Sequence, residues 1–414
     1  MRIVQINMIH YGSTGKIMMQ IAETARNRGD EVLTFSTRTY SKVKTNEPQI
    51  SQGHKLFGSK FSAFLHSLLG KIFAKNGFYS RCATKRLVRK IKKYNPDIIH
   101  LHNIHNFCIN LPILFNYIKR KNIKTVWTLH DCWAFTGHCA YFDMANCDKW
   151  KTGCHNCLHY TDYPKVYKDN TKWLYKKKKE LFTGIRDLTI VTPSNWLARL
   201  VEQSYLKNYP VKVINNGIDL SVFKPTHSDF RQRFNLQDKF VLLGVAFGWD
   251  KRKGLDVFVE LAKRLDSNVF KIVLVGVNAE TATNLPDNII AINRTNNQTE
   301  LAEIYSMADL FVNPTREEVF GMVNAESLAC GTPILTFKTG GSPEVIDATC
   351  GSVVEKDDID SLEQEILRIY KKHPYTKDAC ITRSKLFDKN DKFSEYVNLY
   401  LELYEKNRYN DTLF

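Results

Sequence analysis

The chain has 414 residues, of which 43% are hydrophobic and 25% are charged. This length predicts two or three domains, and the composition excludes wholesale disorder, collagen-like repeats and low-complexity chains. Because no run of about 18 apolar residues occurs and the N-terminus lacks the apolar stretch of a signal peptide, we expect a soluble, cytoplasmic protein.

The net charge of +16 is unevenly distributed along the chain. Residues 1–200 contain 33 Lys and Arg against 12 Asp and Glu, whereas residues 201–414 contain 26 against 31. A basic half can face nucleic acid, an anionic membrane or acidic substrates, so charge alone leaves the partner open.

Short apolar runs alternate with segments of helical periodicity in two successive series. This alternation predicts an α/β fold with two doubly wound parallel sheets that face a central cleft. The predicted strands lie at 3–6, 32–35, 97–101, 125–129, 188–191, 211–214, 240–245, 271–275, 309–312 and 333–336.

The pattern pauses near residues 219–225, which places a domain boundary there. We expect an N-terminal domain over 1–222 and a second domain over 223–392. Residues 393–414 begin with an aromatic and apolar helical stripe, which either closes the second domain or packs back on the first.

A glycine-containing loop follows the first predicted strand, with Gly12 and Gly15 before Lys16. Its spacing is too short for a nucleotide-triphosphate loop of the Walker A type. Two alternatives stay open: a loop that lies over a diphosphate or an acceptor, or a plain tight turn.

The segment 54–93 contains eleven Lys and Arg and no acidic residue. Apolar residues recur at helical spacing within it, which predicts a basic amphipathic helix. Either it docks on an anionic membrane, or it is a core-facing helix with a solvated basic side. The apolar residues are Phe57, Phe61, Phe64, Leu65, Leu68, Leu69, Ile72 and Phe73.

Histidines cluster at the ends of two predicted strands. His100, His102 and His105 follow one strand at spacings that do not make a compact metal site, so we interpret them as polar wall residues and take His102 as an acceptor-side candidate. His130 ends the next strand, where doubly wound sheets bind ligands, and we expect it to contact substrate.

Five cysteines fall within the 26 residues from Cys132 to Cys157, inside a Cys-rich insertion over 132–160. Four of them have spacings that suit a closed, structural zinc site; an iron–sulfur cluster is an alternative, and disulfides suit a reducing cytoplasm poorly. The predicted zinc ligands are Cys139, Cys147, Cys154 and Cys157. Farther on, Lys176–Lys179 is predicted to be a solvated helix face.

The most informative segment is PTREEVFGMVNAESLACGTP, residues 314–333. Phe320 and Gly321 mark a turn into a helix, whose free N–H groups suit phosphate. The Glu326 carboxylate can accept two ribose hydroxyls, and Glu318 in the preceding loop can hold sugar hydroxyls. The alternative is two solvated carboxylates at a helix start.

Several motifs, in this order, resemble the retaining nucleotide-sugar glycosyltransferases of family 4, which have the GT-B fold. They are the Glu-x7-Glu segment, Asn216-Gly217-Ile218-Asp219, Lys253-Gly254, Gly340-Gly341-Ser342-Pro343-Glu344 and His130-Asp131. The N-terminal loop and the segment HDCWAFTGHC are most similar to a bacterial exopolysaccharide subgroup of the colanic-acid type.

The resemblance implies a sugar transfer from a UDP- or GDP-sugar to a growing, lipid-linked oligosaccharide, with retention of configuration and no catalytic metal. It implies catalytic roles for His130 and Glu318, and an acceptor-side position for Gly12 and His102. The donor would contact Gly15, Arg252, Lys253, Phe320, Gly321, Glu326, Gly341 and Ser342. Such an enzyme is expected in the cytoplasm, peripheral to the inner face of the plasma membrane.

One position departs from the family pattern: Gly248 stands where the family has a diphosphate-binding Arg. Either Arg252 supplies that charge, since a guanidinium forks onto two phosphate oxygens, or Lys253 acts alone. Two other functions stay open: a sugar-nucleotide epimerase of the same fold, and a basic zinc protein that binds nucleic acid. The Glu-x7-Glu segment argues against the second, and we expect no nucleic-acid partner.

Overall fold

The computed structural model describes residues 1–38, 52–105 and 108–411. The chain divides into two compact units, which we call the N-terminal unit (Met1–Asn215 with Asn390–Phe414) and the C-terminal unit (Asn216–Lys389). Each unit is an α/β domain built on its own parallel sheet, as the alternation of strands and helices in the sequence predicts.

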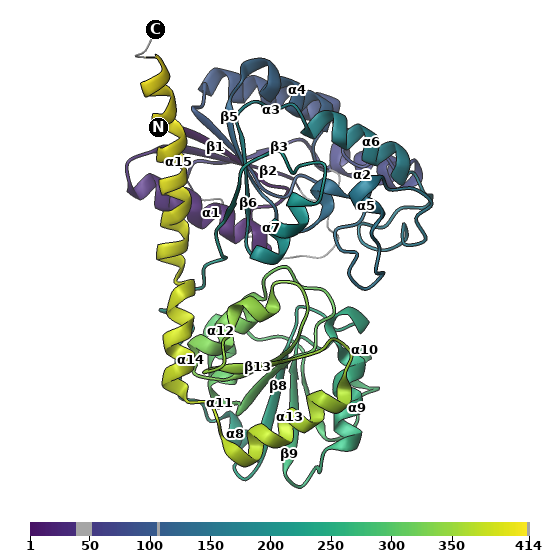
Figure 1. Ribbon diagram of the computed structural model, residues 1–414, viewed down its shortest axis with the longest axis vertical. Helices are drawn as coiled ribbons and strands as arrows, with labels where there is room; N and C mark the ends of the chain where they lie inside the picture. The colour runs from purple at the N-terminus through teal and green to yellow at the C-terminus, as the bar shows by residue number, and fades with distance from the viewer. Residues whose placement is uncertain (39–51, 106–107, 412–414) are drawn as a thin grey trace. The chain divides into compact units, whose positions relative to one another are not determined.

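The N-terminal unit has a seven-stranded parallel sheet within the described residues, with helices on both faces (Figure 1). Its spatial order is β3-β2-β1-β4-β5-β6-β7. The strands are β1 Arg2–Ile6, β2 Glu31–Thr37, β3 His54–Phe57, β4 Ile98–Leu101, β5 Lys124–Thr128, β6 Leu188–Thr192 and β7 Val211–Val213. The helices are α1 Gly12–Asn27, α2 Lys60–Ile72, α3 Arg81–Tyr94, α4 Leu111–Lys121, η1 Trp133–Phe135, α5 Lys149–Thr152, α6 Thr171–Phe182, α7 Asn195–Glu202 and α15 Lys389–Asp411.

The C-terminal unit has a six-stranded parallel sheet in the order β10-β9-β8-β11-β12-β13. The strands are β8 Phe240–Val245, β9 Phe270–Val275, β10 Ile289–Ile292, β11 Leu310–Asn313, β12 Ile334–Phe337 and β13 Gly351–Val354. The helices are α8 Phe230–Arg233, η2 Lys251–Lys253, α9 Leu255–Arg264, α10 Ala279–Ala282, α11 Gln298–Met307, α12 Met322–Ala329, η3 Ser342–Val345, α13 Ile359–Lys372, α14 Lys377–Ser384 and η4 Lys385–Phe387.

Strand β8 shows why its sequence is apolar at every position. Val241 and Leu243 pack in one hydrophobic cluster of the C-terminal unit, whereas Phe240 and Leu242 pack in another. Because successive side chains of a strand point to opposite faces, a sheet covered on both faces needs apolar residues throughout.

In each sheet the strand order reverses at one point. The reversal lies between β1 and β4 in the N-terminal unit and between β8 and β11 in the C-terminal unit. The loops that leave these strands at their carboxyl ends diverge to opposite faces, and this leaves a crevice where such folds bind ligands.

The two chain crossings between the units are tied together within the C-terminal unit. Ile218 N–H donates to the Phe387 carbonyl at 2.8 Å, and Lys389 N–H donates to the Ile218 carbonyl at 2.9 Å. A side chain at Gly217 would meet Lys389 Cα at 2.5 Å, so the close approach requires glycine. The units therefore divide after Asn215 and Lys389, a few residues before the boundaries predicted at 222 and 392.

From Asn390 onward, α15 belongs to the N-terminal unit. Tyr396 and Tyr400 are buried there, and the Tyr400 hydroxyl lies 2.5 Å from His100 Nδ1 on β4. Among the described residues, no helix combines the length and the hydropathy that a membrane crossing requires.

Candidate active site

The first group of candidate residues lies at the strand-order reversal of the C-terminal unit. Lys253 follows β8 at the end of η2, and Glu318 follows β11. Lys253 Nζ lies 2.8 Å from Glu318 Oε2, and each side chain is 20% exposed. The fold therefore brings together two residues that are 65 positions apart and leaves both within reach of a ligand.

The charges at this pair are fixed by its surroundings. Burial raises the pKa of Glu318, but Lys253 and Arg252 outweigh it, and the net pKa is lowered. Glu318 is consequently a carboxylate at neutral pH. The Arg252 side chain is one-third exposed, with Nε 4.0 Å from Asp250 Oδ2, so each of the two cations at this edge has a carboxylate beside it.

The loop that carries Glu318 is held by a glycine turn. Gly340 has φ +56°, and a Cβ there would lie 1.7 Å from the Glu318 carbonyl oxygen. The next residue, Gly341, donates its N–H to that oxygen at 3.1 Å. The two glycines thus place the backbone of Glu318.

The side chains of two predicted donor contacts, Phe320 and Ser342, are buried and pack or hydrogen-bond within the protein. Phe320 is buried against Phe387, with ring centroids 5.5 Å apart. Ser342 is buried and its hydroxyl lies 2.8 Å from both Asn324 Nδ2 and Thr336 Oγ1. These side chains support the turn and do not point at a ligand, and the Ser342 N–H and carbonyl are hydrogen-bonded to Thr339 and Asn324 as well.

Gly321 begins α12 with φ +87° and ψ +61°, a left-handed conformation that favours glycine. Just over one turn into that helix, Glu326 Oε2 accepts a hydrogen bond from the Tyr305 hydroxyl at 3.2 Å. The predicted helix start and the position of Glu326 on the helix are thus both present.

Glu326 lines a cavity of about 350 Å³ at the carboxyl ends of the strands. Sequence reasoning assigned no role to two of its lining residues, Phe247 and Arg294. Phe247 is 93% exposed, and the Arg294 guanidinium lies 5.4 Å from its ring centroid. An exposed aromatic ring and a guanidinium are both planar groups on which a nucleobase can stack. The only signal in the sequence was Phe247 following a buried strand.

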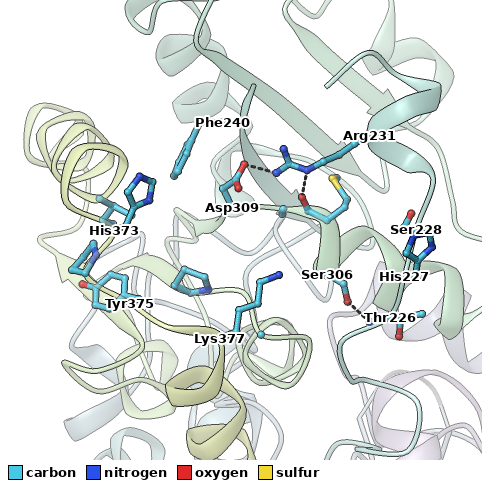
Figure 2. A pocket seen from close by; sticks show the side chains of 16 residues that line it. Thr226, His227, Ser228, Arg231, Phe240, Ser306, Asp309, His373, Tyr375 and Lys377 are labelled. Carbon is cyan, nitrogen blue, oxygen red and sulfur yellow. Dashed lines mark hydrogen bonds and ion pairs between the residues drawn. The ribbon is translucent and has the colours of Figure 1, made fainter. Parts of the chain in front are cut away.

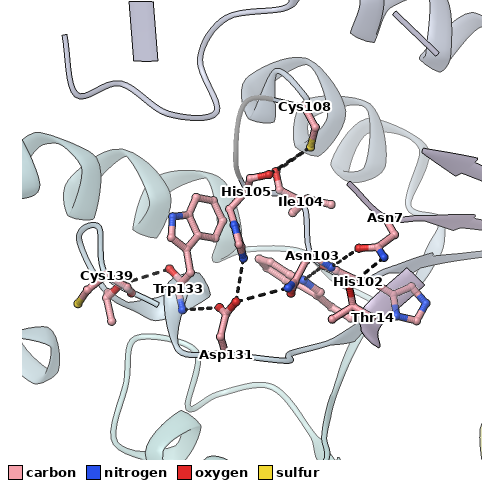
Figure 3. A network of polar contacts seen from close by, with 12 residues as sticks. Asn7, Thr14, His102, Asn103, Ile104, His105, Cys108, Asp131, Trp133 and Cys139 are labelled. Atoms are coloured by element: carbon pink, nitrogen blue, oxygen red, sulfur yellow. Dashed lines mark hydrogen bonds and ion pairs between the residues drawn. The ribbon is translucent and has the colours of Figure 1, made fainter. Parts of the chain in front are cut away.

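A second polar network lies at the strand-order reversal of the N-terminal unit (Figure 3). Asn7 follows β1, Asn103 follows β4 and Asp131 follows β5. Asn103 N–H donates to Asn7 Oδ1 at 3.1 Å, and its amide nitrogen lies 3.4 Å from Asp131 Oδ2. His105 Nε2 lies 2.8 Å from the same carboxylate oxygen. Asp131 thus joins two neighbouring strand ends.

His102 and His130 are brought together at this edge. His102 Nδ1 lies 3.2 Å from His130 Nε2, and His102 Nε2 lies 3.2 Å from Gln5 Oε1. His102 is fully buried, whereas His130 is partly exposed. Burial lowers the pKa of His130 to about 4, so its ring is neutral at neutral pH and offers hydrogen bonds, not charge.

The N-terminal loop leads directly into α1. Gly12 is exposed with φ +69°, and Gly15 is buried in the first turn. A Cβ on Gly15 would lie 2.5 Å from the His10 carbonyl carbon, so this glycine permits close packing of the loop on the helix.

The four predicted zinc ligands are free thiols. Among the described residues, no group of three or more His, Cys, Asp and Glu is arranged to hold a metal ion. Cys154 Sγ accepts a hydrogen bond from Gly137 N–H at 3.1 Å, and a Cβ on Gly137 would lie 2.6 Å from Cys154 Cβ. The Cys-rich insertion is therefore packed closely here.

The prediction of a solvated face at Lys176–Lys179 is wrong for Lys178, which is fully buried. Its ammonium lies 3.7 Å from the Trp133 ring centroid and donates to the Trp133 carbonyl. Burial lowers the pKa of Lys178 to about 7. Helical periodicity missed this, because α6 turns one lysine toward the Cys-rich insertion.

A larger cavity of about 560 Å³ lies at the opposite edge of the C-terminal sheet (Figure 2). Phe240, Asp309 and Pro333 line it at the amino ends of their strands, and Arg231 pairs with Asp309 at 2.5 Å. It is remote from the carboxyl-end loops, so its size does not make it the active site.

Comparison with known proteins places these features in a family. Residues 14–222 match the family described as Glycosyltransferase Family 4, and residues 227–386 match Glycosyl transferases group 1. The putative colanic acid biosynthesis glycosyl transferase WcaC of Escherichia coli is 25% identical over 281 residues. That match covers 65% of this chain and 66% of the relative.

Two solved structures share the fold over nearly their whole length. Sucrose-phosphate synthase from Thermosynechococcus elongatus has a TM-score of 0.70 at 18% identity, over 98% of this chain and 99% of that one. Anabaena HepE, solved with UDP, has a TM-score of 0.69 at 16% identity, over 97% and 100%. At such identities the likeness establishes the fold, which is GT-B.

Proposed function

The chain belongs to glycosyltransferase family 4, and from this premise we propose that it transfers a sugar from a nucleoside diphosphate donor to a bacterial polysaccharide acceptor. The observation that carries the proposal is the pair of Lys253 and Glu318 at the strand-order reversal. One provides a cation for phosphate, and the other provides a carboxylate for sugar hydroxyls.

The donor would bind along the carboxyl edge of the C-terminal sheet. Glu326 would hold the ribose hydroxyls in the cavity of about 350 Å³, with the base near Phe247 and Arg294. Lys253 and Arg252 would then neutralise the diphosphate. The UDP bound by HepE, which shares the fold, supports a nucleotide-sugar donor.

We propose that the reaction retains the anomeric configuration. The leaving diphosphate gains charge as the glycosidic bond breaks, and fixed cations stabilise that charge without a metal ion. Glu318 would orient the sugar, and the neutral ring of His130 would offer it hydrogen bonds. Donor and acceptor incubated together should yield the donor's anomeric configuration, as measured by NMR coupling constants of the product.

We further propose a lipid-linked oligosaccharide as the acceptor. The name of the Escherichia coli relative places that protein in colanic acid biosynthesis, which supports a polysaccharide product. Exposed apolar side chains of α2 in the N-terminal unit, such as Phe61 and Leu65, support an acceptor held at a membrane.

The donor site can be tested by thermal shift with UDP-, GDP- and ADP-sugars. We expect one class to raise the melting temperature of the wild type and of Glu280→Gln, an exposed control in the same unit, and to raise that of Glu326→Gln much less. An equal shift in all three proteins would remove Glu326 from the site. No shift with any sugar nucleotide, with or without acceptor lipid, would overturn the donor assignment.

A further inference from the structure

Helix α2 presents its apolar side chains to solvent. Phe61 is 71% exposed, and Phe64, Leu65, Leu68 and Ile72 are each exposed by about two fifths. Their spacing of three and four residues places them on one face of the helix. This stripe lies outside the protein core, so of the two alternatives for this segment the core-facing apolar side does not describe α2.

The inner face of α2 explains this inversion. The buried residues of the helix are His66 and Gly70, not large apolar side chains. His66 Nδ1 lies 2.8 Å from Ser80 Oγ, and Gly77 N–H donates to His66 Nε2 at 3.1 Å. These two hydrogen bonds of His66 hold its face of α2 inward, and the apolar stripe on the opposite face therefore remains exposed.

The apolar surface continues beyond the helix. Phe73 is 43% exposed, and Lys168 Nζ lies 5.4 Å from its ring centroid. Tyr167, 60% exposed, donates its N–H to the Lys71 carbonyl at 3.0 Å. Two chain segments thus contribute to one surface, which we call the α2 surface: Phe61, Phe64, Leu65, Leu68, Ile72, Phe73 and Tyr167.

Basic residues belong to the same chain segments as the α2 surface: Lys60 and Lys71 lie in α2, and Lys168 Nζ lies close to the Phe73 ring. Segment 54–93 contains eleven Lys and Arg and no acid. In α3, the next helix along the chain, the basic side chains are exposed, whereas Ala83, Leu87 and Ile91 are buried. The exposed basic residues of α3 are Arg81, Lys85, Arg86, Arg89, Lys90, Lys92 and Lys93.

We propose that the α2 surface docks on an anionic phospholipid bilayer, with the apolar stripe in the interfacial region and the lysines and arginines of the same chain segments at the headgroups. Apolar burial and attraction to anionic lipid act together in such surfaces. A second copy of the chain is the poorer occupant, because a symmetric contact would oppose two strongly basic segments. The proposal goes beyond the transferase reaction, since membrane binding is measured without turnover.

The test is co-sedimentation of the full chain with vesicles of phosphatidylcholine alone or with about 30% phosphatidylglycerol. We expect binding to the anionic vesicles only, and a partition coefficient at least about tenfold lower for the triple variant Phe61→Ser, Leu65→Ser, Leu68→Ser. The matched control is Leu386→Ser, since Leu386 is 54% exposed in the C-terminal unit. All variants should keep the wild-type melting temperature, because the replaced side chains lie on the surface.

Three outcomes would overturn the proposal. These are no sedimentation of the wild type with anionic vesicles, equal sedimentation of the triple variant, and a concentration-dependent dimer that the triple variant abolishes. If the wild type bound anionic vesicles but transferred no sugar, that result would count against the transferase proposal and not against membrane docking.

Discussion

At the scale of single residues, Lys253 offers the most direct test of the proposed reaction. In the structure its ammonium forms an ion pair with Glu318, and the diphosphate of a bound donor would be attracted to the same ammonium. We predict that Lys253→Met lowers kcat/KM by about 10²–10³-fold, the usual loss when one preorganised donor of the transition state is removed.

The neighbouring Lys251 supplies the control for this prediction. It is exposed at the start of the same short helix, so Lys251→Met should stay within about threefold of the wild type. Equal losses in both variants would indicate a general electrostatic effect and remove the specific role from Lys253.

The buried histidines predict how stability depends on pH. Burial lowers the pKa of His66 to about 3, well below its ordinary value of about 6.5. Below pH 6.5 His66 binds a proton in the unfolded chain but not in the folded chain. The contribution of the neutral His66 ring to the free energy of unfolding is therefore present above pH 6.5 and is lost as the pH falls.

We expect His66→Gln to lose less stability than the wild type, by about 1 kcal/mol, when pH falls from 7.5 to 5.5. Urea midpoints at the two pH values measure it, with His155→Gln, an exposed position, as the control. Identical pH dependence in wild type and His66→Gln would contradict the assignment.

At the scale of elements, the Gly340–Gly341 turn is decisive for the loop that carries Glu318. Because a Cβ at position 340 would overlap the Glu318 carbonyl and φ is +56°, Gly340→Ala should destabilise the C-terminal unit by about 2–4 kcal/mol. Chemical denaturation measures this loss, and donor binding should weaken with it.

Gly248 is the matched position for comparison. A Cβ there would have no atom within 4 Å, and φ is not positive, so Gly248→Ala should be neutral or slightly stabilising. If Gly340→Ala were as stable as Gly248→Ala, the turn would be more adaptable than its geometry indicates.

The Cys-rich insertion has little regular structure between η1 and α6, with α5 alone among its described residues. Structural zinc on Cys139, Cys147, Cys154 and Cys157 stays a prediction. Elemental analysis of the purified full chain should find about one zinc per chain, and Cys154→Ser with Cys157→Ser should remove it.

The exposed Cys82 is the control for these substitutions, because Cys82→Ser should leave the metal content unchanged. Protein without bound metal that melts at an unchanged temperature after zinc is added would contradict the prediction. Iron in place of zinc would favour the iron–sulfur alternative.

At the scale of the whole molecule, the C-terminal segment returns to the N-terminal unit. Tyr396 and Tyr400 are buried there, and Tyr400 contacts His100 on a central strand. Ending the chain at Lys389 should therefore raise amide exchange in β4 and β5 while β8 and β9 stay protected. Equal exchange in both sheets after truncation would show that the division into two units does not govern stability.

The two α/β units and the residues after their strands could be predicted from the sequence. Continuous apolar runs such as that of β8 are required when both faces of a strand are buried, so the pattern identified the central strands. The strands that it missed, β3, β10 and β13, lie at sheet edges and are only partly buried. The segment from Glu318 to Glu326 was predictable for the same reason, because a strand, a glycine turn and a helix start are all local signals.

Contacts between distant residues were not predictable in this way. Only in the folded sheet does Lys253 pair with Glu318, and only there does Gly340 approach the Glu318 carbonyl. The hydrogen bonds of the Ser342 hydroxyl with Asn324 and Thr336 likewise form only on folding.

By itself the sequence determined most of the strands and helices, because periodicity and turn residues act over a few positions, but it did not reveal β3, β10 and β13. Only the tertiary structure decided which face each helix turns inward. Helix α2 exposes its apolar stripe because His66 is satisfied inside, and α6 buries Lys178 because the Cys-rich insertion covers it. Facing depends on neighbours that are distant in sequence, and local patterns do not encode those neighbours.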